Sequence, residues 1–295
     1  MPNCPISRYP SPVGHRERMD VNYQLIAFDM DGTLLSSTKE VLASSRAAIA
    51  EALGAGKVVA ICTGRCPKMV ELDRESIGDV RYAICCNGTI LYDLVEHRVL
   101  SASPLGHDVI ARALDALGDG DAMIDAFSGR GFFCQDSHLD TMDRYHMGIY
   151  QGLYRATASL VRDIRAQLLD PSVTYQKFIF HCATPELRQR VRERVAGLPV
   201  ELANSEVSSL EFSPAGVDKG TGLLALAELL GVPRDATIAV GDADNDLGML
   251  RAAGLGVAMG NANEGARAAA DAVVADNDHD GCAEAIHRFL LESER

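Results

Sequence analysis

The sequence predicts an α/β protein with a doubly wound, Rossmann-like parallel sheet, into which a smaller α+β module is inserted. Short, continuously apolar runs alternate with stretches of helical periodicity near both ends of the chain. Such strands are typical of a parallel sheet that helices cover on both faces. In the middle of the chain this alternation is replaced by paired β-rich runs around short turns, which are typical of a separate module.

The first part of the sheet is expected within residues 21–91. Its elements alternate in type, in the order strand Leu25–Met30, helix Ser44–Leu53, strand Lys57–Thr63, helix Pro67–Ile77 and strand Tyr82–Cys86. Ser44 is the expected N-cap of the first helix, because a serine hydroxyl can accept a backbone hydrogen bond there. Pro67 suits the first turn of the second helix, where the missing backbone N–H costs nothing.

The second part of the sheet is expected within residues 214–295, and the inserted module within residues 92–213. The C-terminal elements are expected to be helix Lys219–Leu230, strand Thr237–Val240, helix Asp246–Ala253, strand Leu255–Met259 and helix Asp280–Glu292. The module is expected to contain the strands Ala122–Phe127, Gly131–Gln135 and Tyr175–His181 and the helices His107–Leu117 and Thr184–Ala196. Residues 1–20 contain four prolines and are expected to form a disordered tail.

The composition limits the partners that the protein can have. Acidic residues outnumber basic ones by 41 to 28, and the net charge of -13 disfavours nucleic acid and anionic membrane surfaces. The sequence contains no run of about 18 apolar residues, so it predicts no membrane span. The eight cysteines are scattered without a C-x-x-C pair, which favours free, buried thiols in the reducing cytoplasm over a zinc site or disulfide framework. The sequence gives no indication of the oligomeric state.

Two carboxylates stand where the first predicted strand ends. Asp29 and Asp31 follow the apolar run Leu25–Phe28, and buried carboxylates are costly unless they are paired or bind a cation. In an open parallel sheet, ligands bind beyond the carboxyl ends of the strands. Polar residues follow three further strands, at Thr63-Gly64-Arg65, at Asn87-Gly88 and at Gly241-Asp242-Ala243-Asp244-Asn245-Asp246. These clusters are therefore expected to converge on one crevice.

Four of these motifs together resemble a known family. The stretches Asp29-Met30-Asp31-Gly32-Thr33-Leu34, Thr63-Gly64-Arg65, Asp218-Lys219-Gly220 and Gly241–Asp246 follow one another as in the haloacid dehalogenase (HAD) superfamily. With the tail Gly256–Ala262, they are similar to its Cof-like phosphatase branch. The resemblance implies a HAD-like core with an inserted cap that acts as a substrate lid. It also implies a phosphatase for small phosphorylated metabolites, such as sugar phosphates or nucleotide or cofactor monophosphates.

The two acids of the first motif suit the hydrolysis of a phosphate ester. Asp29 can attack the phosphorus atom and form an aspartyl-phosphate. Asp31 lies one pleat along on the same side of the strand, and it can protonate the departing oxygen and later take a proton from water. The resemblance implies Mg²⁺, with ligands from Asp29, Asp31 and Asp242 and with Asp246 as a further acidic group.

The remaining motif residues suit the binding of the phosphoryl group. The Lys219 ammonium and the Thr63 hydroxyl would contact its oxygens, helped by backbone N–H groups of the turns at Gly32 and Gly64. Asn245 and Arg65 are expected to contact phosphate or substrate. Thr63 could instead simply end its strand. Likewise, Asn87-Gly88 could be no more than a turn, and Asp244 is expected to be a solvated turn residue.

Two other functions are compatible with the motifs. A phosphomannomutase-like enzyme would transfer a phosphoryl group between two positions of a sugar, and a non-catalytic sensor would bind a phosphometabolite without cleaving it. The substrate is a small phosphate ester in each case, and the sequence does not name it. Five residues of the module could contact a leaving group, although exposed surface is the default for such side chains: Arg130, Arg144, Tyr145, His146 and Lys177.

Overall fold

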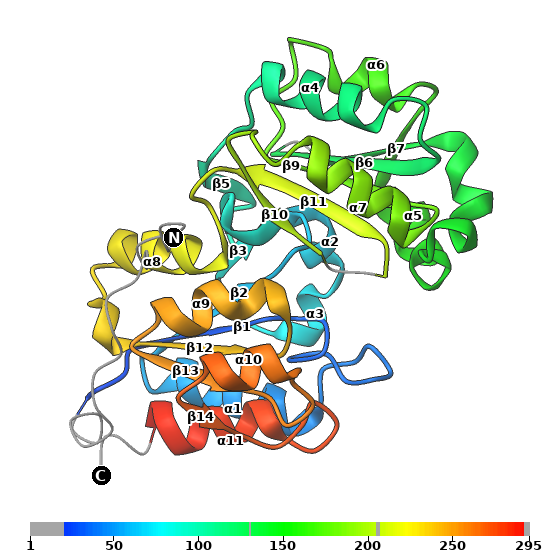
Figure 1. Ribbon diagram of the computed structural model, residues 1–295. Coiled ribbons are helices and arrows are strands. Elements are labelled where there is room, and N and C mark those ends of the chain that lie inside the picture. The colour runs from blue at the N-terminus through cyan, green and yellow to red at the C-terminus, as the bar shows by residue number, and fades with distance from the viewer. Residues whose placement is uncertain (1–20, 130, 205–206, 292–295) are drawn as a thin grey trace. The chain divides into compact units, whose positions relative to one another are not determined.

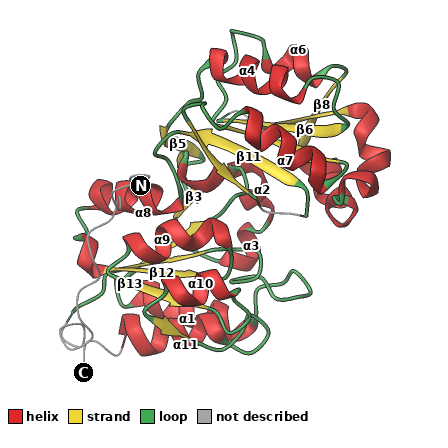
Figure 2. Ribbon diagram, in the orientation of Figure 1, coloured by secondary structure: helices red, strands yellow, loops and turns green. Residues whose placement is uncertain are grey.

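The computed structural model describes residues 21–129, 131–204 and 207–291, and the expected tail over residues 1–20 lies outside them. The chain forms two compact units (Figures 1 and 2). The first consists of the described residues up to Ala60, of Gly78–Val80 and of those from Leu223 onward. The second consists of Ile61–Ile77 and Arg81–Gly222. The predicted division into a core and a module over residues 92–213 stays a prediction.

The first unit contains a parallel sheet. Its strands lie in the order β14 (Ala272–Val273), β13 (Leu255–Ala258), β12 (Thr237–Gly241), β1 (Leu25–Phe28) and β2 (Val58–Cys62), the last of which crosses the unit boundary. Every residue of β1, β12 and β13 is buried. Because successive side chains of a strand point to opposite faces, both faces of this sheet are covered. The predicted α/β class with a parallel sheet is confirmed.

Two groups of helices pack in the first unit, and their members are labelled in Figure 1. α9 (Leu247–Ala252) and α10 (Glu264–Ala269) contact each other and β13. α1 (Ala43–Gly54) contacts α11 (Gly281–Ala285) and the π-helical turn Ile286–Leu291 that continues α11. The helix predicted over Asp280–Glu292 is therefore partly a π-helix.

Two predicted helix details are wrong. α1 begins at Ala43 after Leu42, which caps it without a side-chain hydrogen bond. The Ser44 hydroxyl instead donates to Asp280 Oδ1 at 2.5 Å, an acceptor 236 positions away that local sequence could not reveal. The helix predicted over Pro67–Ile77 is split into α2 (Pro67–Leu72) and α3 (Arg74–Ile77), because Asp73 between them has left the helical conformation.

The second unit continues from the end of β2 into strands that pair differently. β3 (Tyr82–Cys85), β4 (Ile90–Asp93) and β5 (Arg98–Ala102) form antiparallel pairs in this order. β4 and β5 were not predicted, since the turn between them carries no Gly or Asn signal of a tight hairpin. The parallel arrangement predicted for the core therefore ends at β3.

The second unit also contains a separate sheet of six strands. The order is β10 (Val200–Ala203), β11 (Ser209–Pro214), β9 (Lys177–Cys182), β6 (Ala122–Ser128), β7 (Gly131–Gln135) and β8 (Ala158–Val161). The hairpin predicted for β6 and β7 is confirmed, because these strands pair antiparallel across the intervening turn. The strands of this sheet and the helices between them belong to one chain segment, as expected of an α+β module.

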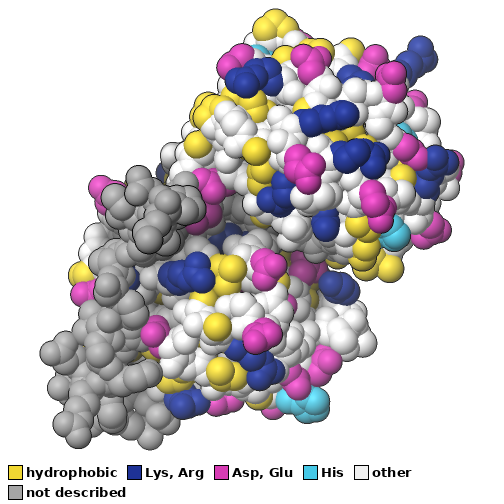
Figure 3. Space-filling model, in the orientation of Figure 1, with side chains coloured by type: hydrophobic (Ala, Val, Ile, Leu, Met, Phe, Trp, Pro, Cys, Tyr) yellow, Lys and Arg dark blue, Asp and Glu magenta, His cyan; other side chains and the backbone are white. Residues whose placement is uncertain are grey.

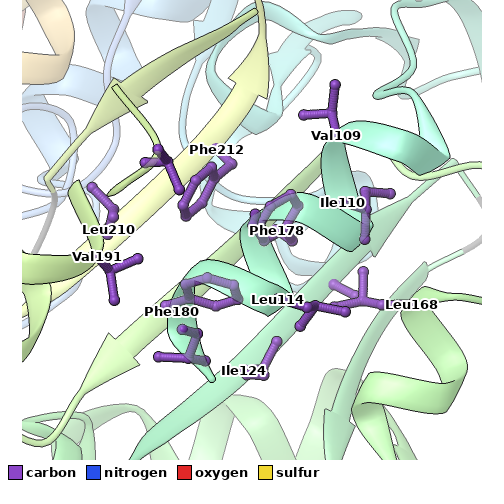
Figure 4. Packing of buried hydrophobic residues seen from close by; sticks show 14 of the residues in the cluster. Val109, Ile110, Leu114, Ile124, Leu168, Phe178, Phe180, Val191, Leu210 and Phe212 are labelled. Atoms are coloured by element: carbon purple, nitrogen blue, oxygen red, sulfur yellow. The ribbon is translucent and has the colours of Figure 1, made fainter. Parts of the chain in front are cut away.

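The two faces of the six-stranded sheet have different compositions. One packs against helices α4 (His107–Leu117), α6 (Ile164–Leu168) and α7 (Pro185–Arg194) through aromatic and aliphatic side chains such as Phe178, Phe180 and Phe212, which Figure 4 shows. Alternate residues of the same strands point to the other face. Buried polar residues lie there, namely Asp125, Lys177, His181 and Glu211. α5 (Gln151–Thr157) contributes Tyr154 to this polar group.

No helix among the described residues is long and apolar enough to cross a membrane.

Candidate active site

Three carboxylates of the first unit lie together at the ends of two neighbouring strands. Asp29 follows β1, whereas Asp242 and Asp246 follow β12, which pairs with β1 in parallel. The Asp29 N–H donates to the Val240 carbonyl at 3.0 Å, which fixes the two strand ends side by side. One oxygen from each of the three carboxylates lies within 4.8 Å of the others. Asp29 and Asp246 are buried, and Asp242 is half-buried.

Local hydrogen bonds orient the two acids after β12. Asp246 Oδ2 accepts from the backbone N–H groups of Asp242 and Ala243, at 2.9 and 3.0 Å. The hydroxyl of buried Thr33 donates to Asp242 Oδ1 at 2.7 Å. Thr33 therefore belongs to the site, although it was not among the predicted site residues. The signal was present, because Thr33 directly follows Gly32 in the first motif.

A glycine makes room for Asp242. Gly32 has a φ of +89°, which favours glycine, and a Cβ there would lie 2.5 Å from Asp242 Oδ2. The Gly32 carbonyl accepts from the Asn261 side chain at 2.8 Å, so the turn is also held from the far end of the chain. Glycine is thus required both by the backbone conformation and by the approach of the carboxylate.

Cys282 also contacts this turn. Its thiol donates to the Thr33 carbonyl at 3.3 Å. Burial raises the pKa of the Cys282 thiol far above its ordinary value, and the carboxylates of Asp29 and Asp242 raise it further. Cys282 is therefore a neutral thiol that supports the turn. The cysteines among the described residues are free and buried, as predicted.

The donor set of the acidic cluster suits a hard divalent cation. Carboxylate oxygens are the preferred ligands of Mg²⁺, and three carboxylates this close repel one another unless a cation or protons neutralise them. Asp31 is not in this group. Its Oδ1 pairs with the Lys39 ammonium at 2.9 Å, and its side chain is 33% exposed. The carboxylate of Asp31 is thus on the solvent side of the turn, where proton exchange with water is possible.

The second motif forms a tightly held loop in the second unit. Thr63 is buried, its N–H donates to the Ile84 carbonyl at 2.8 Å, and its hydroxyl oxygen accepts from the Arg65 N–H at 3.2 Å. The Arg65 guanidinium forms an ion pair of 2.7 Å with Asp73, the residue that interrupts the predicted helix. The predicted substrate contact of Arg65 would therefore have to coexist with this pair.

Lys219 is the first residue of α8 (Lys219–Leu230), and its side chain is fully buried. A backbone turn packs directly against this position. Gly88 has a φ of +96°, and a Cβ there would lie 2.0 Å from the Asp218 carbonyl oxygen. Asn87, buried and also at positive φ, precedes it and uses its side chain for a hydrogen bond. Asn87-Gly88 therefore does more than turn the chain, because Asn87 binds Glu211 and Gly88 packs against the backbone of Asp218.

The other predicted residues vary in their surroundings. Asn245 is half-buried within the short 3₁₀ helix Asp244–Asp246, and Asp244 is exposed, as predicted for a turn residue. Arg144 pairs with Asp121, which also accepts a hydrogen bond from the Tyr145 hydroxyl at 3.0 Å. Burial and this carboxylate raise the pKa of Tyr145.

Three more residues of the module were predicted as possible contacts to a leaving group. His146 is exposed and Arg130 lies outside the described residues. For Lys177 the default expectation of an exposed side chain is wrong. Only 2% of it is accessible to solvent, because Glu211 offers it a buried ionic partner from a different strand.

The fold and the acidic cluster define a class of α/β enzymes whose reactive groups stand beyond the carboxyl ends of parallel strands. The sequence model of haloacid dehalogenase-like hydrolases matches residues 26–286. The chain is 28% identical over 283 residues to 5-amino-6-(5-phospho-D-ribitylamino)uracil phosphatase of Bacillus subtilis, covering 93% of this chain and 99% of the relative. It is 29% identical to pyridoxal phosphate phosphatase of Escherichia coli, with 91% and 99% covered.

A solved structure agrees with these relatives. A haloacid dehalogenase-like hydrolase from B. subtilis, 28% identical, superposes with a TM-score of 0.81 over 90% of this chain and 100% of that one. The chain therefore belongs to the haloacid dehalogenase-like hydrolases, in their Cof-like phosphatase branch. The family that the four motifs predicted is confirmed, and so is the enzyme class, a phosphoric monoester hydrolase.

Proposed function

We propose that the protein is a Mg²⁺-dependent phosphatase that hydrolyses small phosphorylated metabolites through an aspartyl-phosphate on Asp29. The cluster of Asp29, Asp242 and Asp246 carries the proposal, because the buried carboxylate of Asp29 lies beside two further carboxylates whose oxygens suit a cation. Relatives that act on pyridoxal phosphate and on a phosphoribitylamino-uracil support the substrate class. We also propose a cytoplasmic location, in keeping with the buried free thiols.

Asp29 and Asp31 have different roles in the proposed reaction. An Asp29 oxygen attacks phosphorus, the bond from phosphorus to the ester oxygen breaks, and Asp31 donates a proton to the departing oxygen. Water then attacks the phosphorus of the aspartyl-phosphate and gives a proton to Asp31, which releases inorganic phosphate and restores Asp29. Mg²⁺ held by the acidic cluster would supply positive charge to the phosphoryl oxygens. We propose Asp29, Asp242 and Asp246 as its side-chain ligands.

The phosphoryl group needs further positive and hydrogen-bonding partners in a protein with a net charge of -13. On the face seen in Figure 3, Lys and Arg side chains are interspersed with Asp and Glu, so local groups must provide the attraction. We propose that Lys219, Thr63 and the Gly64 N–H bind the transferred phosphoryl oxygens. Arg65 and Asn245 are proposed as additional contacts to phosphate or substrate. Nucleic acid and membranes are not expected partners.

Removing divalent cations with EDTA is expected to lower the hydrolysis of p-nitrophenyl phosphate by about 100-fold or more, because the anionic ester then meets uncompensated carboxylates. Adding Mg²⁺ in excess should restore the rate, and calorimetry should detect Mg²⁺ binding without any substrate. Undiminished turnover in EDTA would exclude the proposed metal dependence.

Replacing Gly32 with alanine is expected to weaken Mg²⁺ binding by about tenfold or more, because the added Cβ displaces the Asp242 carboxylate. Isothermal calorimetry with Mg²⁺ measures this directly. Gly56→Ala is the matched control, since Gly56 also has a positive φ, +77°, but no atom lies within 4 Å of the added Cβ. Equal Mg²⁺ affinity of both variants and the wild type would show that the Gly32 turn does not shape a metal site.

The substrate is to be identified by screening about a hundred phosphorylated metabolites with Mg²⁺. Release of inorganic phosphate from a small set of esters is the expected result. Isomerisation of a hexose phosphate without phosphate release would instead favour the mutase alternative. Phosphate binding without any release from any ester would favour a sensor.

A further inference from the structure

Lys177 is a buried ammonium group of the second unit, with 2% of its side chain accessible to solvent. Its Nζ pairs with Glu211 Oε2 at 2.7 Å and donates to the Gly64 carbonyl at 3.0 Å. The ring of Phe127 lies below it, with its centroid 5.2 Å from Nζ. A buried charge is costly, and an apolar pair of similar volume is often no less stable. Stability alone therefore does not account for Lys177.

The acidic partner of Lys177 also connects to the second motif. Glu211 Oε2 accepts a hydrogen bond of 2.6 Å from the Asn87 side chain. The Asn87 backbone N–H in turn donates to the Thr63 carbonyl at 3.1 Å. A Cβ on Gly64 would lie 3.2 Å from Asn87 Oδ1 and 3.5 Å from Lys177 Nζ, so both side chains pack directly on this glycine. Lys177 of β9 thus holds the loop directly, and Glu211 of β11 holds it through Asn87.

All three carbonyl groups of the loop have partners. Those of Thr63 and Arg65 accept from the backbone N–H groups of Asn87 and Cys86, at 3.1 and 2.9 Å. The Gly64 carbonyl has no such backbone donor among the described residues, and its partner is Lys177. Among the three carbonyl groups, that of Gly64 is therefore the one held by a side chain, whereas the other two are held by the backbone of the turn after β3.

The peptide between Gly64 and Arg65 transmits this restraint to Thr63. Its carbonyl end is held by Lys177, and its N–H end donates to Thr63 Oγ1 at 3.2 Å. A hydroxyl has one hydrogen to donate and can accept at its lone pairs. Because Thr63 Oγ1 accepts from this peptide, its own hydrogen is directed elsewhere, and no acceptor for it is present in the described part of the chain.

We propose that Lys177 is a positioning residue for phosphate binding: it fixes the Gly64–Arg65 peptide so that the Thr63 hydroxyl donates to an oxygen of the phosphoryl group. The proposal deepens the proposed function and rests on it. Lys177 acts through Thr63 and does not itself contact the reacting atoms. Its effect must therefore depend on the presence of the Thr63 hydroxyl.

A double-mutant cycle tests this dependence, with Lys177→Met in the wild-type and Thr63→Ala backgrounds. In the wild-type background, Lys177→Met is expected to raise both KM for p-nitrophenyl phosphate and the inhibition constant of inorganic phosphate by about tenfold, the effect of one hydrogen bond to a charged group. Thr63→Ala alone should have a similar effect. In the Thr63→Ala background, Lys177→Met should change either constant by less than about twofold, and Lys177→Arg should restore part of the wild-type affinity.

Equal effects of Lys177→Met in both backgrounds would overturn the proposal, as would an unchanged inhibition constant. Lys57→Met is the matched control, because Lys57 is also buried, binds Asn22 and the Tyr23 carbonyl, and immediately precedes β2, whose other end leads to Thr63. It should lower the thermal midpoint without changing phosphate inhibition.

If Lys177→Met does not fold, Lys177→Met/Glu211→Gln removes both charges, keeps an acceptor for Asn87, and carries the same cycle. A wild-type protein that hydrolyses no phosphate ester contradicts the proposed function. In that case the dissociation constant of inorganic phosphate, measured by calorimetry for each variant, still tests the role of Lys177 in the same cycle. If the wild type is active and the effects of the two substitutions are additive, only the role of Lys177 is contradicted, and the proposed function stands.

Discussion

Replacing Asp29 with asparagine is expected to abolish the hydrolysis of p-nitrophenyl phosphate, with kcat reduced by about 10⁴-fold or more. The amide has nearly the shape of the carboxylate, so the buried position after β1 remains filled. It lacks the anionic oxygen that attacks phosphorus, and no other described carboxylate holds the same position. Release of p-nitrophenolate at saturating Mg²⁺ measures the loss.

The control for this variant is Asp244→Asn. Asp244 is an exposed acid of the same motif as Asp242 and Asp246, but it is outside the cluster and accepts a hydrogen bond from Asn263. Its replacement removes one negative charge from the neighbourhood and should change kcat by less than about twofold, because exposed charges are screened. Full turnover by Asp29→Asn would rule out the aspartyl-phosphate mechanism.

Gly88→Ala is expected to have the largest effect on stability, lowering the free energy of unfolding by about 3 kcal/mol or more. The φ of Gly88 is +96°, and the new Cβ would lie 2.0 Å from the Asp218 carbonyl oxygen. That oxygen belongs to backbone at the start of α8, so it cannot move away as a flexible side chain could. Urea denaturation of both proteins, followed by circular dichroism, gives the difference.

Gly231→Ala separates the two causes of this loss. Gly231 follows α8 and also has a positive φ, +69°, but no atom lies within 4 Å of its added Cβ. The expected loss there is about 1 kcal/mol, the cost of the left-handed conformation alone. An equal loss at both positions would contradict the steric explanation. The variant at position 88 should also weaken phosphate inhibition, since it displaces the backbone beside Lys219.

Elements with a strong and uninterrupted pattern could be predicted from the sequence. Helices α4 and α8 have the predicted bounds, because apolar residues recur along each at helical spacing up to a glycine just beyond its end. The strands β1, β2, β12 and β13 of the parallel sheet were predicted to within one or two residues, since each is a continuous apolar run. The two-residue strand β14 was not predicted. The family was predictable as well, because its motifs are short segments that follow these strands.

Contacts between distant residues could not be predicted. Lys177 appears as one more basic residue of the module, and only the pairing of β9 with β11 brings Glu211 beside it. The ion pair of Asp31 with Lys39 depends on a turn that no motif specifies. The acidic cluster could be anticipated because its members directly follow paired strands. The meeting of Thr63 and Lys219 with Asp29 around one phosphoryl group stays a prediction.

The alternation of side chains in the six-stranded sheet has a consequence for how such a protein can change over generations. Asp125 and Glu211 both stand opposite Ile179 in the register, on the face away from the aromatic residues Phe178, Phe180 and Phe212. A mutation at any of the first three positions removes no side chain from the aromatic packing, because neighbouring residues of a strand belong to different faces. The polar group and the aromatic packing are thus encoded at alternate positions of the same strands, so a substitution in one set does not replace a member of the other.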